Sequence, residues 1–340
     1  MNEVFEQSKI KIENKIIEIL DKEIEKYSYN EFLKSSLEEL KRLSMGGKRV
    51  RGYLIKLGQM LFGKDDDTFV DIAAAVEIFQ TAILIHDDII DEAEKRRGMD
   101  TINYKYSGHI GISKGICIGD LGFFISYRII NNSNISSELK DEIIKIYSKT
   151  LHNTVNGEII DVELPLKSIE YHKSMDEKII YDIYINKTAW YTIIGPLLIG
   201  AASADAKEAD KIKLVEAGIN LGIAFQIKDD LLGLYSDYNK MGKTLNDIKE
   251  GKQTIIYKYA INNANEEQFN IIKKYYGKDN LNVEENKIII DLFKEIGAKE
   301  NAEKLVEEYT KKGISVINNM NLENKDLFLD FANYLLKREK

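Results

Sequence analysis

Cysteine and proline are almost missing from this chain of 340 residues, which holds 1 cysteine, Cys117, and 2 prolines, Pro165 and Pro196. A single cysteine excludes an internal disulfide and fits a reducing compartment. So few prolines disfavour a turn-rich all-β fold and are compatible with long helices. Cys117 lies in the apolar run GICIGDLGFF, so we expect it to be buried in the core rather than to serve as a reactive thiol.

Long apolar runs and an excess of positive charge are also absent. No uninterrupted apolar stretch reaches the roughly 18 residues that a membrane span needs, and the N-terminal MNEVFEQSKIKIENK lacks the apolar core of a signal peptide. The net charge of -8 argues against a nucleic-acid-binding surface. These absences predict a soluble cytoplasmic protein with no transmembrane segment and no nucleic-acid partner.

Apolar residues recur at helical spacing along nearly the whole chain, and no segment shows the alternation of a strand. The helix over 176–203 should kink at Gly195-Pro196. We find no repeat and no linker, so residues 1–340 are predicted to form a single all-α domain, one large helical bundle. The expected helices cover residues up to about 27, 30–43, 53–62, 69–92, 109–131, 136–162, 176–203 and 206–235, with shorter helices to the end.

The stretch FQTAILIHDDIIDEAEKRRG, residues 79–98, joins an apolar helical half to a cluster of charges. Asp87 and Asp91 are four residues apart, so they share one face of a helix, with Asp88 beside them. Paired carboxylates suit Mg²⁺, which takes one or two of them and completes its shell with water and substrate phosphates. Taken alone, the stretch is also compatible with an ordinary solvated helix end.

A second acidic pair, Asp229 and Asp230, also follows an apolar helical run. Two such motifs on long helices can face each other across the interior of a bundle, where metal and ligand sites are built. Basic residues stand around both motifs, and Arg and Lys are the usual ligands of diphosphates. These residues are Lys48, Arg49, Arg51, Arg96, Arg97, Lys187, Lys243 and Lys252.

Carboxylates with Mg²⁺ and a surround of basic residues predict a substrate that carries a diphosphate. A large apolar interior beside them predicts that the substrate also carries a hydrocarbon tail. The matching chemistry is ionisation of an allylic diphosphate. Metal ions and cations stabilise the leaving diphosphate in such a reaction, and a water-poor pocket protects the carbocation.

The motifs, taken in order, resemble the trans-isoprenyl diphosphate synthases, or polyprenyl synthetases. The matching fragments cover most of the chain and are GGKRVRG, Gln80, DDIIDEAEKRRG, Lys187-Thr188, FQIKDD and GKTLNDIKEGKQT. The resemblance implies an all-α bundle of the isoprenoid synthase type around a central cavity. It also implies a homodimer that condenses isopentenyl diphosphate head-to-tail with dimethylallyl, geranyl or farnesyl diphosphate.

The resemblance further implies a role for each matching residue. Asp87 and Asp91, with Asp88 as a lesser contributor, would bind Mg²⁺ at the allylic diphosphate, and Asp229 would hold a third ion. Arg96, Lys187 and Lys243 would grip that diphosphate, with Gln226 beside it. The residues that would bind the diphosphate of isopentenyl diphosphate are Lys48, Arg51, Gln80 and Arg97. Thr188 and Gln226 would offer dipoles to the cation, Lys252 would help to close the site, and the released diphosphate would accept the proton.

Some positions depart from the family pattern. Gly233 stands where many members have the last aspartate of a second DDxxD, and Glu158 replaces a frequent Gln. Gln80 stands where many bacterial members have His, and both side chains can hydrogen-bond a phosphate. Asp100 replaces the usual Pro after RRG-x, which makes that loop less constrained.

Product length in this family depends on the residues one to three turns before the first aspartate. Ala82 and Ile83 occupy the nearest positions, and the small Ala82 leaves room where farnesyl-forming enzymes often carry an aromatic. Phe79 lies one turn further down and Val76 deeper. We therefore expect geranylgeranyl diphosphate or a longer product, and we expect Ala82→Phe to shorten it.

Five alternatives compete with this interpretation. A class I terpene cyclase should carry an Asn/Asp…Ser…Glu motif in place of FQIKDD and lack GGKRVR, and a head-to-head synthase is disfavoured on the same ground. A non-catalytic partner subunit should have lost the first acidic motif or its arginines. A purely structural acidic helical protein and, within the family, a farnesyl diphosphate synthase complete the alternatives.

Overall fold

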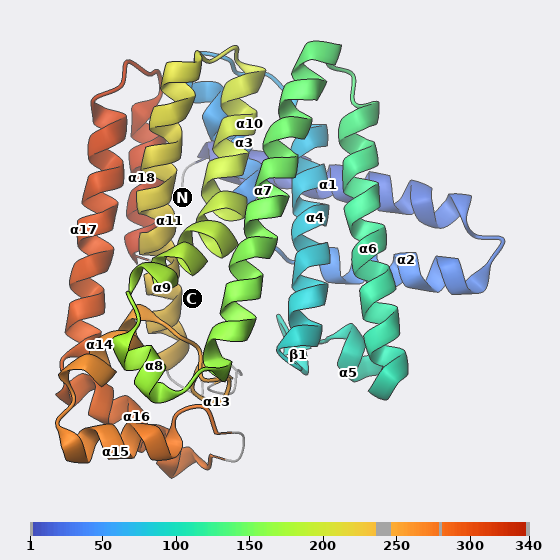
Figure 1. Ribbon diagram of the computed structural model, residues 1–340. Coiled ribbons are helices and arrows are strands. Elements are labelled where there is room, and N and C mark those ends of the chain that lie inside the picture. Colours follow the sequence, from blue (N-terminus) through green and yellow to red (C-terminus); the bar gives the residue numbers. More distant parts are fainter. Residues whose placement is uncertain (1–2, 236–245, 279–280, 338–340) are drawn as a thin grey trace. The chain divides into compact units, whose positions relative to one another are not determined.

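The computed structural model describes residues 3–235, 246–278 and 281–337 (Figure 1). Helices dominate it, so the predicted all-α class is confirmed. The first helices are α1 Glu3–Lys26, α2 Glu31–Ser44, α3 Val50–Leu61, α4 Phe69–Ile90, α5 Ile102–Tyr106, α6 Gly108–Asn132 and α7 Ser137–Glu163. Then follow η1 Leu164–Leu166, α8 Ile169–Ser174, α9 Lys178–Ile183, η2 Tyr184–Ile194, α10 Gly195–Ser203 and α11 Glu208–Tyr235. The last are α13 Asn246–Lys249, α14 Ile255–Asn263, α15 Glu266–Tyr275, α16 Val283–Glu295, α17 Ala298–Asn318 and α18 Lys325–Lys337.

A short antiparallel ribbon follows α4, where the sequence predicted only a loop. It consists of β1 Lys95–Arg96 and β2 Met99–Asp100, and Arg96 pairs with Met99. The two residues of its turn, Arg97 and Gly98, both have positive φ, of 52° and 77°. Such left-handed pairs form the tight turns that join two short strands. Strands of two residues are too short to show alternation in a sequence.

The chain divides into two compact units, each described here by itself. The first contains residues 1–147 and 196–206, and the second contains residues 148–195 and 207–340. The chain therefore passes from the first unit to the second within α7 and returns once, through α10. That residues 1–340 act as a single domain stays a prediction.

Three glycines of α6 bring it close to α4 in the first unit. A Cβ atom placed on Gly119 would lie 2.3 Å from Nε2 of His86, and one on Gly122 would lie 2.9 Å from Cβ of Ala82. One on Gly115 would lie 2.6 Å from a methyl group of Ile89. A larger residue at Gly122 would meet Ala82 directly, and one at Gly115 or Gly119 would displace the side chain of Ile89 or His86. This close seam therefore positions the helix that carries the first acidic motif.

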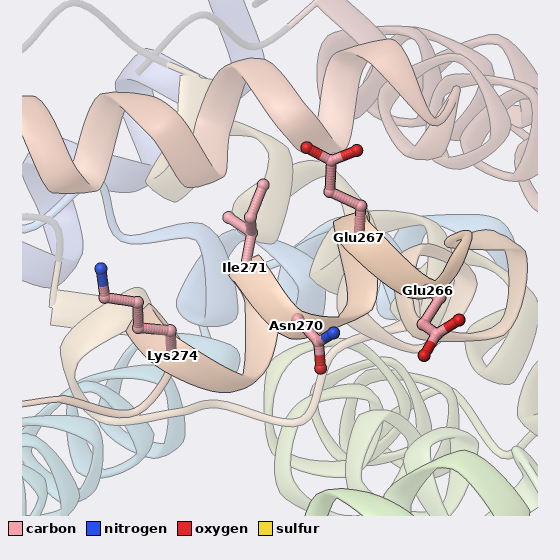
Figure 2. A pocket seen from close by; sticks show the side chains of 5 residues that line it. All are labelled: Glu266, Glu267, Asn270, Ile271 and Lys274. Atoms are coloured by element: carbon pink, nitrogen blue, oxygen red, sulfur yellow. The ribbon is translucent and has the colours of Figure 1, made fainter.

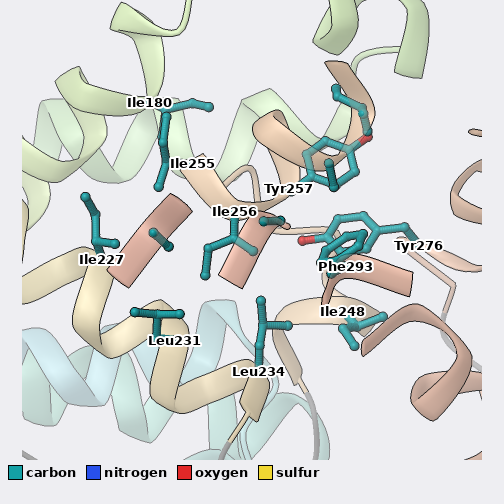
Figure 3. Close-up of a cluster of buried hydrophobic side chains, with 14 of the residues drawn as sticks. Ile180, Ile227, Leu231, Leu234, Ile248, Ile255, Ile256, Tyr257, Tyr276 and Phe293 are labelled. Carbon is teal, nitrogen blue, oxygen red and sulfur yellow. The ribbon is translucent and has the colours of Figure 1, made fainter. Parts of the chain in front are cut away.

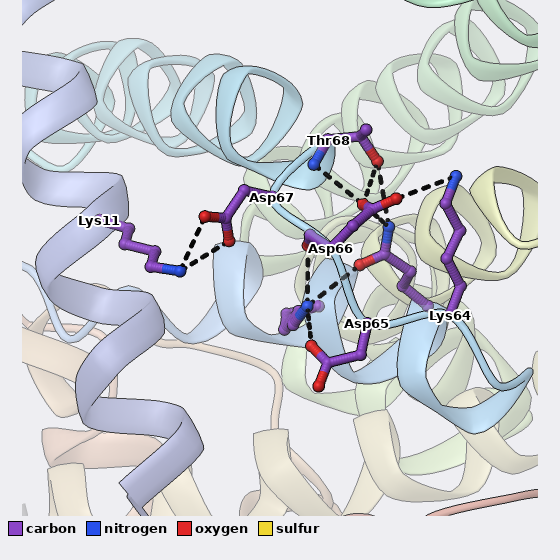
Figure 4. Close-up of polar contacts among 8 residues, drawn as sticks. Lys11, Lys64, Asp65, Asp66, Asp67 and Thr68 are labelled. Carbon is purple, nitrogen blue, oxygen red and sulfur yellow. Dashed lines mark hydrogen bonds and ion pairs between the residues drawn. The ribbon is translucent and has the colours of Figure 1, made fainter.

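The loop before α4 is held by a dense set of polar contacts (Figure 4). One carboxylate oxygen of Asp66 accepts hydrogen bonds from the backbone N–H of Thr68 at 3.0 Å and from the side-chain amide of Gln59 at 2.8 Å. Lys11 of α1 reaches Asp67 at 2.7 Å. The loop thus ties the start of α4 to α3 and α1, satisfying polar groups at the helix N-terminus.

The side of α6 that faces away from α4 is apolar and exposed. Phe124 is 73% exposed, and Ile116 and Tyr127 are each nearly half exposed. Cys117 is exposed on the same helix, so the prediction that it packs in the core is wrong. The apolar run continues around the helix, and run composition does not reveal which of its residues face inward.

Two described helices, α4 and α6, are long and apolar enough to cross a membrane by length and composition. The apolar window of α4 is 72% buried inside the protein, as in the core helix of a globular protein, and that of α6 is 39% buried. The absence of a membrane-spanning segment therefore stays a prediction.

In the second unit, a π-helix stands where the sequence predicted one long helix kinked at Gly195-Pro196. Residues 176–203 form α9, then the π-helix η2 over Tyr184–Ile194, and then α10. The departure from α-helical geometry thus begins eleven residues before Gly195. π-helical segments occur frequently at functional sites, and η2 contains Lys187 and Thr188.

Aliphatic side chains of α9, α11 and α14 form the core of the second unit (Figure 3). Ile180, Ile227 and Ile256 are fully buried there, and Tyr257 stacks on Tyr276 with 4.3 Å between ring centroids. This core holds α11, and with it the second acidic motif, against η2 and α14. It gives the polar residues described below a rigid support.

Candidate functional site

The first acidic motif occupies the last turn of α4. Asp88 is buried, with 2% of its surface exposed, whereas Asp87 and Asp91 are partly exposed. Asp91 caps the helix, and its backbone N–H donates to the carbonyl of Asp87 at 2.8 Å. The structure therefore brings the three carboxylates to one helix end, as the sequence predicted.

Arg96 of the ribbon folds back onto this helix end. Its Nε donates to Asp88 at 2.6 Å, and its Nη2 donates to Asp87 at 2.8 Å. Burial nevertheless raises the pKa of Asp88 to about 6, against the opposing charge of Arg96 and with smaller contributions from Asp87 and Asp91. Three carboxylates thus share this helix end with one arginine, an arrangement that suits a bound cation.

The basic loop between α2 and α3 presents alternating exposed and buried residues. Lys48 is exposed, whereas Arg49 and Arg51 are buried. Arg49 precedes α3 in the left-handed conformation, with φ of 57°, and its Nη2 donates to the carbonyl of Ser44 at 2.7 Å. Because that conformation disfavours a branched or bulky side chain, it must be held by such contacts.

Glu77 of α4 holds the start of α3, and sequence reasoning did not single it out. It is 2% exposed, accepts the backbone N–H of Gly52 at 2.9 Å and lies 3.8 Å from Nη1 of Arg49. A glutamate inside the apolar half of α4 was the available signal, since a buried charge needs a partner.

The arginines of this region lie close enough to repel one another. A Cβ atom on Gly47 would lie 2.9 Å from Nη1 of Arg49 and 3.5 Å from Nη1 of Arg97. Arg97 is exposed at the surface, but partial desolvation lowers the pKa of its guanidinium, and the neighbouring charges of Arg49, Arg96 and Arg51 lower it further. A cluster of like charges held by the fold favours an anion that binds to several of them.

A cavity of about 10 Å³ lies within the cluster, room for roughly one water molecule. Its walls include the buried Asp88 together with Arg96 and Arg97, which the motifs assign to different diphosphates. Its lining residues are Leu43, Thr81, Leu84, Ile85, Asp88, Arg96, Arg97 and Met99. Gln80, on the same helix, is partly exposed.

Ala82 and Phe79, the two residues that we expect to influence product length, are both buried in the first unit. The methyl group of Ala82 lies beside Gly122 of α6. The ring of Phe79 contacts Phe123 and Tyr147, with centroids 5.4 Å and 5.2 Å apart. A larger side chain at Ala82 therefore meets α6, and the role of either residue in product length stays a prediction.

In the second unit, Lys187 lies between two carboxylates of α7. Its Nζ is 2.6 Å from Asp161 and 2.9 Å from Glu158. The helices approach closely here, because a Cβ atom on Gly157 would lie 2.2 Å from the backbone nitrogen of Lys187. Glu158, the departure from the family pattern, thus pairs with the lysine that the motifs assign to the allylic diphosphate.

Thr188 and Gln226, to which the motifs give a shared role, are in direct contact. The hydroxyl of Thr188 donates to Oε1 of Gln226 at 2.5 Å, and Nε2 of Gln226 donates to Asp230 at 2.8 Å. Asp230 is buried, whereas its neighbour Asp229 is exposed. The two aspartates of the second motif therefore face opposite environments.

The remaining predicted residues are placed as follows. Lys252 lies 3.2 Å from Glu250 in the loop before α14. Lys243 lies outside the described residues. Among the residues that the structure describes, no three His, Cys, Asp or Glu side chains form a metal site by themselves. Two carboxylates with substrate phosphates would still suit Mg²⁺.

A shallow hollow on α15 contains none of the residues that the motifs single out (Figure 2). It is lined by Glu266, Glu267, Asn270, Ile271 and Lys274, all from that one helix. It does not have the enclosed apolar walls that ligand sites have.

The chain is similar to known proteins over most of its length. A family model for polyprenyl synthetases matches residues 31–293. The chain is 33% identical over 298 residues to a short chain isoprenyl diphosphate synthase of Methanocaldococcus jannaschii, with 86% of each protein covered. It is 31% identical over 276 residues to a geranylgeranyl diphosphate synthase of Sulfolobus acidocaldarius, with 80% of each covered.

Solved structures show the same fold. A geranylgeranyl pyrophosphate synthase of Corynebacterium glutamicum, complexed with isoprenyl diphosphate and magnesium, superposes with a TM-score of 0.90 at 24% identity, over 99% of this chain and 100% of that one. A geranylgeranyl pyrophosphate synthetase of Pyrococcus horikoshii gives 0.85 at 26% identity, over 99% and 97%. The chain thus belongs to the polyprenyl synthetase family and is a trans-prenyltransferase, as its ordered motifs predicted.

Proposed function

We propose that this enzyme condenses isopentenyl diphosphate head-to-tail with an allylic diphosphate (dimethylallyl, geranyl or farnesyl) through an allylic carbocation. The observation that carries the proposal is the juxtaposition of three carboxylates with a cluster of arginines in the first unit. Arg96 contacts Asp87 and Asp88, and its neighbour Arg97 approaches the basic loop. Cations for a diphosphate thus lie directly beside ligands for a divalent metal.

The carboxylates fit Mg²⁺. Asp87, Asp88 and Asp91 offer hard oxygen ligands at one helix end. We propose that Asp229 holds a third ion. When bound, Mg²⁺ neutralises charge on the leaving diphosphate.

The other residues keep the roles that the family motifs give them. Arg96, Lys187 and Lys243 would grip the allylic diphosphate with Gln226 beside it, and Lys48, Arg51, Gln80 and Arg97 would bind the other diphosphate. Thr188 and Gln226 would present their dipoles to the cation. Lys252 would help to exclude water. Because the departing diphosphate takes the proton, no side chain is needed as a base.

Geranylgeranyl diphosphate or a longer polyprenyl diphosphate is the proposed product. Relatives named for geranylgeranyl, geranylfarnesyl and octaprenyl products support this, and the small residue at Ala82 agrees with it. A farnesyl diphosphate synthase is the second candidate, because an aromatic ring, Phe79, lies one turn below Ala82.

We also propose that the enzyme is a cytoplasmic homodimer. The exposed apolar side chains of α6, with Phe124 the most exposed among them, support a protein surface that a second copy covers. Light scattering of the purified protein should give twice the mass of 39.0 kDa. A monomer would refute this part of the proposal, and binding to lipid vesicles would instead assign the surface to a membrane.

The central experiment incubates the enzyme with Mg²⁺, labelled isopentenyl diphosphate and allylic primers of increasing length. Chromatography should show linear polyprenyl diphosphates that require both substrates. No product from any primer would refute the proposed function. A cyclic hydrocarbon formed from an allylic diphosphate alone would identify a terpene cyclase.

A further inference from the structure

Tyr184 lies at a junction of three segments in the second unit. It is the first residue of the π-helix η2 and is 2% exposed. Its hydroxyl donates a hydrogen bond to Asp230 of α11 and accepts the backbone N–H of Ile255 at 2.9 Å. Ile255 begins α14, directly after the loop that carries Lys252. One buried hydroxyl thus connects all three segments of this unit in which predicted site residues are described.

Asp230 is in turn hydrogen-bonded to Gln226. One of its carboxylate oxygens accepts from Tyr184 and the other accepts from Nε2 of Gln226, one turn earlier on α11. An ionised carboxylate can only accept hydrogen bonds. Gln226 must therefore direct its NH₂ group, and not its oxygen, towards Asp230. Each carboxylate oxygen of Asp230 thus accepts a hydrogen bond from a protein donor.

The orientation of Gln226 determines the orientation of the Thr188 hydroxyl. With its nitrogen directed at Asp230, Gln226 presents Oε1 to Thr188, and Thr188 donates to it at 2.5 Å. The single hydrogen of the hydroxyl is then used, so only lone pairs remain on the oxygen. Lone pairs, rather than a hydroxyl hydrogen, stabilise a positive centre. If the Gln226 amide were reversed, its NH₂ group would donate to Thr188. The hydroxyl hydrogen of Thr188 would then be able to point in another direction.

We propose that Tyr184 and Asp230 are positioning residues: they fix the amide of Gln226 and, through it, the lone pairs of Thr188 that face the carbocation. This inference rests on the proposed function, because it needs a cationic intermediate. It separates the two aspartates of the second motif, since Asp229 serves the metal while Asp230 serves the orientation of Gln226.

The first test replaces Tyr184 by Phe, which removes only the hydroxyl. The rate constant of a single turnover should fall about tenfold, while the KM values of both substrates change less than about twofold. Tyr181→Phe is the matched control, because Tyr181 stands one turn earlier and its hydroxyl approaches Tyr309, while its ring, which packs edge-on against Tyr184, is kept by Phe. It should keep the wild-type rate. An unchanged rate in the folded Tyr184→Phe variant overturns the proposal.

The second test is a double-mutant cycle between Asp230→Asn and Gln226→Met. An asparagine can offer either end of its amide to Gln226, so the single variant Asp230→Asn should be about tenfold slower than the wild type. In the Gln226→Met background the same change should cost less than about twofold, because Asp230 acts through Gln226. An equal loss in both backgrounds refutes the positioning role.

Magnesium titration distinguishes positioning from metal binding. Asp230→Asn should leave the Mg²⁺ concentration for half-maximal rate unchanged, whereas Asp229→Asn should raise it. A rise in Asp230→Asn would make Asp230 a metal ligand and overturn the inference. A wild-type enzyme that forms no product would instead be a failure of the proposed function, so the two failures are distinguishable.

Discussion

In the first unit the arginines that the motifs single out lie beside one another, whereas in the second unit the corresponding lysine lies between two carboxylates. Arg97 has its pKa lowered by partial desolvation and by neighbouring arginines, while Lys187 is neutralised by Asp161 and Glu158. In the first unit an anion therefore meets several guanidinium groups at once, although Arg96 is also paired with Asp87 and Asp88. In the second unit, an anion must compete with carboxylates for its cation.

The acidic end of α4 is the part of the first unit whose loss should matter most. Asp87→Ala should lower turnover by about 10³-fold, since it removes a metal ligand and a partner of Arg96. Circular dichroism should show an unchanged helix content. Asp71→Ala on the same helix, where Asp71 only pairs with Lys15 at 3.1 Å, should keep full activity. Near-wild-type activity of Asp87→Ala would exclude Asp87 as a ligand.

The clustered arginines of the first unit should determine the affinity for substrate rather than the rate of the reaction. Arg97→Gln should raise the KM of isopentenyl diphosphate about tenfold and leave the KM of the allylic substrate unchanged, because one charge-assisted contact is lost. Initial rates over a range of each substrate measure this. Lys95→Gln, in the same ribbon and paired with Asp100, is the control. A rise in both KM values to the same extent would mean that the arginines do not serve separate diphosphates.

The length of the product tests whether Ala82 of α4, which lies beside Gly122 of α6, forms part of the wall of the substrate cavity. Ala82→Phe should shorten the product and lower the free energy of unfolding by about 1–3 kcal/mol, because the new ring overpacks against Gly122. Chromatography and thermal unfolding measure the two effects. Ile83→Phe, at a partly exposed position one residue on, should cost less stability. A shorter product from Ile83→Phe alone would move the cavity wall to Ile83.

The sequence predicted these sites as far as local motifs can. The helices and the aspartates at the end of α4 follow from motif order and helical spacing, whereas the contact between Thr188 and Gln226, 38 residues apart, does not. Nor does the junction at Tyr184, because its partners Asp230 and Ile255 are 46 and 71 residues away. The left-handed conformation of Arg49 and the π-helix likewise depend on packing, which apolar periodicity does not encode.

The smallest expected effect concerns the compensated lysine of the second unit. Glu158→Gln restores the residue frequent in the family and leaves Asp161 as the partner of Lys187. Both side chains of the lost pair, Lys187 and Glu158, are about one fifth exposed, so the pair stabilises the fold little. The substitution removes one of the two carboxylates that compete with an anion for Lys187. The KM of the allylic diphosphate should therefore fall about threefold. Glu163→Gln, exposed near the end of the same helix, should change nothing. If the KM rises instead, Glu158 helps to bind the substrate, through Lys187 or a metal, and the contrast between the two units disappears.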